Sequence, residues 1–228
     1  IKKKMIARPR PKPEPPKKRV KPVCPSLRRA EPGEVDVIAE QRGLPWQVVE
    51  ALTEREIVKV GRKWGGQCWF YCDSTGWNIR ARRLSGAAFS HAKAMTLRGA
   101  WAAWPIGLDR VSGVRSVLLV EGEGDGASAW AAIWAADAWT EWCVCVMAGS
   151  AMSIPVECLS LFAGKFVRIL PHVGDGTRAG ELGAVRWAEQ LESIGAQVDI
   201  YMVPSGDLGD LVEGKSGDEI RELGLTNR

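Results

Sequence analysis

The residues best suited to chemistry form an acidic, glycine-rich turn. The short apolar run Val117–Val120 leads directly into Glu121-Gly-Glu-Gly-Asp125, which places three carboxylates within five residues. A strand, a glycine-rich turn and a helix would also suit a dinucleotide site. Three carboxylates would repel a pyrophosphate, however, and the acid expected about 20 residues later is missing. The turn therefore favours a divalent cation over a dinucleotide.

Two later apolar runs also end in acidic loops. One is followed by His172 and Asp175, and the other by Asp207 and Asp210. The carboxyl ends of parallel strands meet at one rim of an open α/β sheet, where sites commonly form. Asp and Gly also make good turns, which would explain a single such loop. Three loops in the same topological position favour a site for Mg²⁺ or Mn²⁺.

The apolar pattern predicts the sheet that would position this rim. Continuous apolar runs alternate with helical patterns from residue 113 onward, which is typical of a buried parallel sheet covered by helices on both faces. We therefore predict an α/β fold with a Rossmann-like parallel sheet over residues 113–228. The runs lie at about 117–120, 142–147, 167–170 and 198–203, and the helical patterns at about 127–139 and 179–194.

Residues 34–112 have a different pattern, which predicts a smaller α+β subdomain. We expect two short helices before residue 57, with Gly43 closing the first and Pro45 opening the second. Three strands should follow over 57–83, and Asp73-Ser-Thr-Gly is a turn signal between the last two. The second helix carries more acids than bases, so we expect it to pack rather than to bind DNA.

The basic residues are concentrated in a tail. Residues 1–33 carry 12 basic and 2 acidic side chains and 8 of the 13 prolines, whereas the remainder carries 19 basic and 25 acidic side chains. Prolines and like charges favour an extended, disordered linker. Such a tail can act as a solubilising spacer or as a non-specific phosphate-binding arm, and the two roles are compatible.

Several classes of protein are disfavoured. No apolar run is long enough to cross a membrane, and the basic N-terminus lacks the apolar segment of a signal peptide. We expect a cytoplasmic protein with reduced cysteines. Cys68 and Cys72 have a spacing that zinc tolerates, but no second pair is near, so we expect both thiols on one face of a strand. The chain begins with Ile rather than Met, which indicates a fragment or a processed product.

The acidic loops resemble the TOPRIM domain, which is shared by bacterial-type DNA primases, topoisomerases of types IA and II, and some nucleases. VLLVEGEGD resembles the family's glutamate motif, with Glu121 as its acid–base and metal-region residue. GDLGDL, with Asp207 and Asp210, resembles a downstream acidic motif of phage- and plasmid-type primases. The resemblance implies a TOPRIM fold for residues 113–228.

The Asp-x-Asp motif of the family is altered in this chain. VRILPHVGDGTRAG resembles it, but His172 stands at the first Asp, and Asp175 alone matches the pair. A neutral His suits transition metals better than Mg²⁺. The resemblance implies that Glu121 and Asp175 are catalytic. The metal ligands that it implies are Glu121, Asp175, Asp207, Asp210 and His172, with Mg²⁺ or Mn²⁺ as the ion.

The preceding region is similar to the subdomain that bacterial-type primases place before TOPRIM. STGWNIRARRLSG resembles their glycine-rich hairpin, and HAKAMTLRGAWAAWPIGL resembles the segment after it. The resemblance covers about residues 57–215. A solvated hairpin face is the alternative for its basic residues. The residues implied to contact template or triphosphate are Arg80, Arg82, Arg83 and Lys93.

The leading hypothesis is a primase-type TOPRIM protein of bacterial, phage or plasmid origin, which makes RNA primers on single-stranded DNA from nucleoside triphosphates. A replicative helicase would be a further partner, and the protein would be nucleoid-associated. In such primases a zinc-binding module lies upstream, so the basic tail would be a tether. Two alternatives stay open, a TOPRIM nuclease and a catalytically inactive nucleic-acid-binding module.

Overall fold

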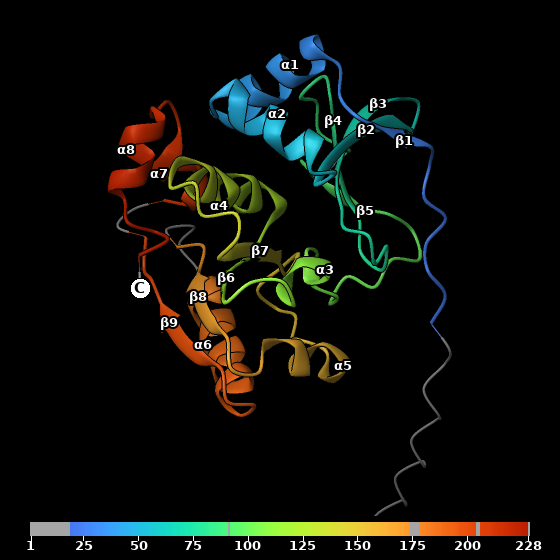
Figure 1. The fold of residues 1–228 in the computed structure, drawn as a ribbon. Coiled ribbons are helices and arrows are strands. Elements are labelled where there is room, and N and C mark those ends of the chain that lie inside the picture. The colour runs from blue at the N-terminus through green and yellow to red at the C-terminus, as the bar shows by residue number, and fades with distance from the viewer. Residues whose placement is uncertain (1–18, 91, 174–177, 204–205, 228) are drawn as a thin grey trace, which may run out of the picture.

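The computed structural model describes residues 19–90, 92–173, 178–203 and 206–227, and it contains two β-sheets (Figure 1). One sheet is antiparallel with five strands, and the other is parallel with four. Helices cover both faces of the parallel sheet, so the predicted α/β class with a smaller α+β part is confirmed. No helix in the described part of the chain is both long and apolar enough to cross a membrane.

The short strand β1, Leu27–Arg28, comes first in the chain and pairs with β2, so this part of the expected disordered tail belongs to the antiparallel sheet. Two helices then precede the other strands of that sheet, as the sequence predicts. Helix α1 spans Pro32–Arg42 and α2 spans Trp46–Glu54. Gly43 ends α1 in the left-handed region, at φ 59°, and Pro45 is the cap residue before α2. Helix α1 begins two residues before the boundary expected at residue 34, because Pro32 suits the first turn of a helix.

The antiparallel sheet is formed by sequential strands in the order β1-β2-β3-β4-β5. Both faces of β3 are buried. Cys68 and Cys72 lie with Phe70 in one apolar cluster, as expected for thiols on one face, and Trp69 and Tyr71 lie in the main core. The strands are β1 Leu27–Arg28, β2 Val58–Lys63, β3 Gly66–Tyr71, β4 Arg80–Arg83 and β5 Met95–Thr96.

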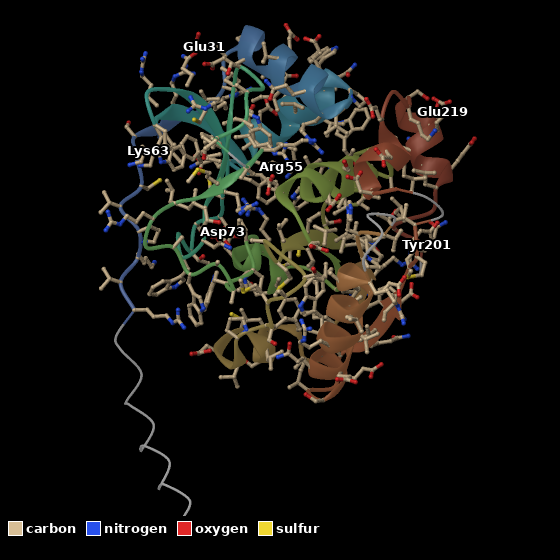
Figure 2. All side chains as sticks on the ribbon, turned by 180° about the vertical axis from the view of Figure 1, so that it is seen from behind. Glu31, Arg55, Lys63, Asp73, Tyr201 and Glu219 are labelled. Atoms are coloured by element: carbon tan, nitrogen blue, oxygen red, sulfur yellow. The ribbon has the colours of Figure 1, made fainter. Side chains whose placement is uncertain are left out.

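The turn after β3 joins the antiparallel sheet to the rest of the molecule. The Asp73 carboxylate accepts hydrogen bonds from the amides of Thr75 and Gly76, and it also accepts one from the amide of Gly107 at 2.7 Å. Gly107 is the residue before the short helix α3, Leu108–Val111. Figure 2 shows Asp73 in the interior, between the two sheets. The turn therefore anchors one sheet against the other.

The parallel sheet has the strand order β7-β6-β8-β9. The chain passes from β6 to its neighbour β7 on one side of the sheet, and later from β8 to its neighbour β9 on the other side. Right-handed crossovers therefore place α4 and α6 on opposite faces and leave a switch point between β6 and β8. The strands are β6 Ser116–Val120, β7 Trp142–Val146, β8 Phe166–Leu170 and β9 Gln197–Ile200, and the two crossover helices are α4 Glu123–Ala135 and α6 Ala179–Glu192.

Four shorter helical segments complete the fold. The two near the C-terminus, α7 and α8, pack on α4, which also contacts α1 and α2 (Figure 1). The segments are α5 Val156–Leu159, η1 Ser160–Phe162, α7 Leu208–Val212 and α8 Gly217–Glu222.

One apolar core spans both sheets. It contains side chains of α1, α2, β2 and β3 together with those of the parallel sheet and α4. Within it, the Trp130 indole on α4 donates a hydrogen bond to the Tyr71 hydroxyl on β3 at 2.9 Å, and both side chains are buried. Helix α4 is therefore fixed against the antiparallel sheet as well as against its own strands.

Candidate metal and phosphate site

Helix α4 begins four residues earlier than the apolar pattern indicated. Gly122 is its cap residue, so Glu123 and Asp125 lie in the first turn of the helix rather than in a loop. The early start needs a close approach at Gly126, where an added Cβ would lie 2.6 Å from a methyl group of Val146 on β7. The two acids are therefore held by helical geometry at the carboxyl end of β6.

A hollow of about 510 Å³ lies at this rim, beside the switch point between β6 and β8. Its walls come from both parts of the chain, since Arg80 and Arg82 belong to the antiparallel sheet and Asp125 and His172 follow the parallel strands. Crevices of this kind are the usual ligand sites of open α/β sheets. Its acidic and basic side chains form two halves.

The acidic half contains a group that could hold a metal ion. Asp125, His172 and Asp207 each offer one ligand atom, and these atoms lie within 4.8 Å of one another. The His172 Nδ1 and an Asp207 carboxylate oxygen are 3.9 Å apart. Burial, and then the charge of Asp207, raise the pKa of Asp125 to about 6. A divalent cation would relieve this crowding of carboxylates, because it favours their charged forms.

The basic half is organised around a buried carboxylate. The Glu123 side chain is 3% exposed, and its two oxygens accept hydrogen bonds from Arg80 Nε at 3.0 Å and Arg82 Nε at 2.7 Å. Burial would raise the pKa of Glu123, but the two guanidinium groups outweigh it and hold that pKa below its usual range. Arg80 also donates to the Thr96 hydroxyl at 2.9 Å. Both arginines therefore have fixed orientations at the wall of the hollow.

Arg42 brings a third guanidinium group from the last turn of α1. It lies against the backbone of α4, where a Cβ on Gly124 would be 2.6 Å from its Nη2. Its Nε is buried, and no acceptor in the described part of the chain bonds to it. Burial lowers the pKa of Arg42, and the charge of Arg82 acts in the same direction. This crowding of cations would be relieved by an anion in the hollow.

The hollow brings together most of the residues that the sequence singled out. Asp175 lies outside the described residues. The Asp210 carboxylate faces the backbone, where it and Asp207 accept hydrogen bonds from each other's amides at the start of α7. The guanidinium of Arg83 lies 4.8 Å from the centre of the Phe89 ring, away from the hollow's lining. Those that line it are Glu121, His172, Asp207, Arg80, Arg82 and Lys93.

Three further lining residues, Arg42, Glu123 and Asp125, are not among those to which the resemblance gives a role, although Glu123 and Asp125 belong to the acidic turn. The place of Asp125 in the first helical turn could be recognised from the local sequence, because an acid three positions after a helix cap can accept a hydrogen bond from the cap amide. The place of Arg42 could not, since it depends on how α1 packs against α4. Glu123 pairs with arginines 41 and 43 residues away.

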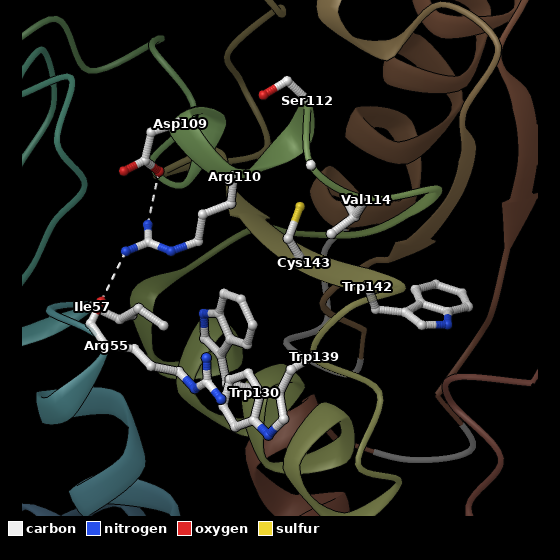
Figure 3. A pocket seen from close by; sticks show the side chains of 11 residues that line it. Arg55, Ile57, Asp109, Arg110, Ser112, Val114, Trp130, Trp139, Trp142 and Cys143 are labelled. Atoms are coloured by element: carbon white, nitrogen blue, oxygen red, sulfur yellow. Dashed lines mark hydrogen bonds and ion pairs between the residues drawn. The ribbon is translucent and has the colours of Figure 1, made fainter.

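A second hollow, of about 460 Å³, lies beneath α3 (Figure 3). The Arg55 guanidinium lies 4.0 Å from the ring centre of Trp139, which stacks on Trp130. Arg110 donates to the Asp109 carboxylate at 2.7 Å and to the Arg55 carbonyl at 3.1 Å (Figure 3). None of the residues predicted to do chemistry lines this hollow.

No protein-family model matches the chain, and no curated protein matches its sequence. Solved structures do share its fold. The primase fragment of the bacteriophage T7 primase-helicase protein is 13% identical with a TM-score of 0.57, and the alignment covers 82% of this chain and 72% of that one.

Two further solved structures are similar. One shows the T7 lagging-strand DNA polymerase with primase domains of two gp4 subunits bound to an RNA/DNA hybrid and dTTP, at 12% identity and a TM-score of 0.51, covering 77% and 85% of the two chains. The other is a DNA primase domain from Pseudomonas aeruginosa, at 17% identity and a TM-score of 0.47, covering 90% and 64%. The chain thus has a fold found in primase domains.

Proposed function

We propose that this chain, whose fold is that of primase domains, joins ribonucleotides into primers on single-stranded DNA in a divalent-metal-dependent reaction. One observation carries the proposal: a single hollow holds a carboxylate–imidazole group beside four cationic side chains. Nucleotidyl transfer needs both, because the negative charge of a triphosphate must be neutralised while the reacting oxygens are aligned. The four cations are Arg42, Arg80, Arg82 and Lys93.

The acidic half fits a divalent cation of the first transition series. Two carboxylates and one imidazole are donors that Mn²⁺ accepts readily, whereas Mg²⁺ prefers oxygen alone. Asp125, His172 and Asp207 would hold the ion, with Asp175 as a further ligand. A bound ion would polarise a phosphoryl oxygen and favour loss of a proton from the attacking hydroxyl. Asp210 would act indirectly, because it fixes the backbone amide of Asp207.

The remaining side chains would bind and orient the substrates. Arg80 and Arg82 are held by Glu123, so their outer nitrogens can face a phosphate without further ordering. Lys93 adds an exposed positive charge at the same wall. Glu121 follows β6 directly and lines the hollow, where it would accept the proton of the attacking 3′-hydroxyl. Arg83, outside the hollow, would contact the template strand.

The partners follow from the same reaction. We infer that single-stranded DNA and nucleoside triphosphates are the substrates, and that a helicase is a partner, as in the T7 protein whose name joins primase and helicase. Residues 34–112 and 113–228 would act as two units that each supply one half of the hollow. The basic tail would tether nucleic acid, and the protein would work at the nucleoid, in the cytoplasm.

The decisive test is extension of a short RNA primer annealed to a single-stranded DNA template, because extension requires only the catalytic core. We expect ribonucleotide addition with Mn²⁺ and a lower rate with Mg²⁺. Asp207→Asn and Glu121→Gln should each lower the rate at least 100-fold. Glu181→Gln is the matched control, since Glu181 lies in the first turn of α6 and outside the hollow. It should extend primers at the wild-type rate.

Other outcomes contradict the proposal in distinguishable ways. Cleavage of labelled DNA with metal and without nucleotides would assign a nuclease to the same hollow. Absence of both activities, together with equal DNA binding by wild type and Asp207→Asn, would assign a non-catalytic binding module. Calorimetric titration with Mn²⁺ separates this last case, because a module without a metal site gives no binding heat.

A further inference from the structure

Three tryptophans that the proposed reaction does not use form a cluster on the antiparallel-sheet side. We call Trp77, Trp101 and Trp104 the tryptophan triad. Their ring centres are 5.1 to 6.3 Å apart, and their planes are inclined at 43° to 89°. All three are half-buried. Inclined rings cannot form one continuous stack, so they present separate faces to the surroundings.

The triad is held rigidly from below. The buried Asn78 side chain donates to the carbonyls of Ala102 and Trp104, at 3.2 and 2.9 Å. The Trp104 indole donates to the Thr75 hydroxyl at 3.1 Å, and the Trp101 amide donates to the Trp77 carbonyl at 2.7 Å. Rigid aromatic rings lose little conformational entropy when a ligand stacks on them.

Two cations of the basic tail lie on these rings. The guanidinium carbon of Arg19 is 3.9 Å from the Trp101 ring centre, and the Lys21 ammonium is 5.3 Å from the Trp77 ring centre. Cation–π contacts at partly exposed sites contribute about 0.5–1 kcal/mol each. Contacts of this strength are easily displaced, so the ring faces are accessible to a competing planar group.

The chemistry of this surface selects its ligand. Aromatic faces bind planar groups, and Arg19 and Lys21 bind anions, so the fitting ligand has both features in one flexible chain. Single-stranded nucleic acid does, because its bases stack on aromatic rings and its phosphates pair with cations. An apolar protein segment would leave two desolvated charges without partners. We propose that the tryptophan triad is a stacking site for bases of single-stranded DNA, which displaces Arg19 and Lys21 from the rings onto its phosphates.

The position of the triad suits a strand that leads to the hollow. Trp77 precedes Arg80 by three residues, which limits the distance between their Cα atoms to about 11 Å. Strand β4 then carries Arg80 and Arg82 into the wall of the hollow. This inference deepens the proposed function by placing the strand. Its binding test needs neither metal nor nucleotide, so the two proposals can fail separately.

The test is binding of a fluorescein-labelled 12-residue oligo-dT, followed by anisotropy in EDTA. Stacking on an aromatic side chain contributes about 1–3 kcal/mol per base. Trp101→Ala should therefore weaken binding about 5-fold to 150-fold, and Trp101→Phe should keep most of the affinity. Trp46→Ala is the matched control, because Trp46 is a half-exposed tryptophan on α2, outside the triad. It should leave binding unchanged.

Three further arms address the ligand and the fold. Wild type should prefer oligo-dT to an abasic strand of equal length, and Trp101→Ala should lose this preference. Replacing both Arg19 and Lys21 by Ala should make the slope of log K against log salt concentration less steep by about 1.4, which corresponds to the loss of two phosphate contacts. Thermal melting by circular dichroism confirms that each variant is folded.

Two results would overturn the inference. Equal oligo-dT affinity of folded Trp101→Ala and wild type would exclude stacking on the triad. Binding of an oligo-rU at least 10-fold tighter than oligo-dT, with the same loss in Trp101→Ala, would assign the site to RNA instead of DNA.

Discussion

The buried Glu123 offers the sharpest test of how the hollow is built. In the Glu123→Gln variant, the two arginines lose their shared carboxylate, and an amide can accept a hydrogen bond from only one side. Removing one partner from a buried ion pair costs about 3–5 kcal/mol. Here the side chains of Arg80 and Arg82 are 20% and 22% exposed, so water can partly solvate them after the change. We therefore expect a loss of about 2–4 kcal/mol in the free energy of unfolding at pH 7.

The stability that Glu123 contributes should also depend on pH, which can be tested separately. The folded pKa of Glu123 lies below its usual range, so the stabilisation is fully present above the unfolded pKa of about 4.3 and is lost as the pH falls toward the folded value. Urea unfolding at pH 7 should thus separate wild type from Glu123→Gln by the full amount. The separation should persist at pH 5.5 and shrink below pH 4.

A matched control is available on the surface. Glu54 also pairs with an arginine, at 2.9 Å from Arg29 Nη2, and the two side chains are 54% and 57% exposed. Exposed pairs contribute about 0–1 kcal/mol, so Glu54→Gln should cost no more than this. If Glu123→Gln costs no more than Glu54→Gln, the two arginines are not held in place by Glu123.

Three other variants test separate features of the fold and the site. Asp125→Asn should stabilise the metal-free protein by about 3 kcal/mol at pH 7.5 and by about half of that at pH 5. The reason is that its carboxyl, with a pKa of about 6, is destabilised when ionised, and urea unfolding at both pH values measures the gain. Tyr71→Phe should lower the free energy of unfolding by about 1–3 kcal/mol, because the Trp130 indole N–H stays buried without its acceptor; an unchanged urea midpoint would contradict this. Gly180→Ala should cost about 1–3 kcal/mol and weaken Mn²⁺ binding in calorimetry, because its Cβ would overlap the His172 carbonyl.

The rim of the parallel sheet could be predicted because its causes are local. Apolar runs of strand length, separated by helical patterns, predict parallel strands, and parallel strands all end at the same edge of the sheet. His172 and Asp207 could therefore be placed at one edge without coordinates, and the structure does place them there. His172 follows the end of β8 by two residues and Asp207 follows the end of β9 by seven, so ending the last strand at 203 instead of Ile200 does not change the edge at which they lie.

The basic half could not be predicted in the same way because its causes are tertiary. The sequence of the turn from Glu121 to Asp125 predicts three carboxylates that repel phosphate, but Glu123 is neutralised by two arginines from another sheet. The local sign of charge therefore cannot be obtained from the turn alone. The position of Arg42 is even less predictable from sequence, since it lies next to Gly124 only because α1 packs against α4.

The contact between Tyr71 and Trp130 has a consequence for motion. Trp130 belongs to the helix that begins with Glu123 and Asp125, and Tyr71 belongs to the strand that pairs with β4, which bears the two arginines. The halves of the hollow therefore cannot separate as two hinged bodies without opening a shared, close-packed interior. Any ligand of the hollow would therefore be accommodated by rotation of exposed side chains such as Lys93, and not by movement of one half relative to the other.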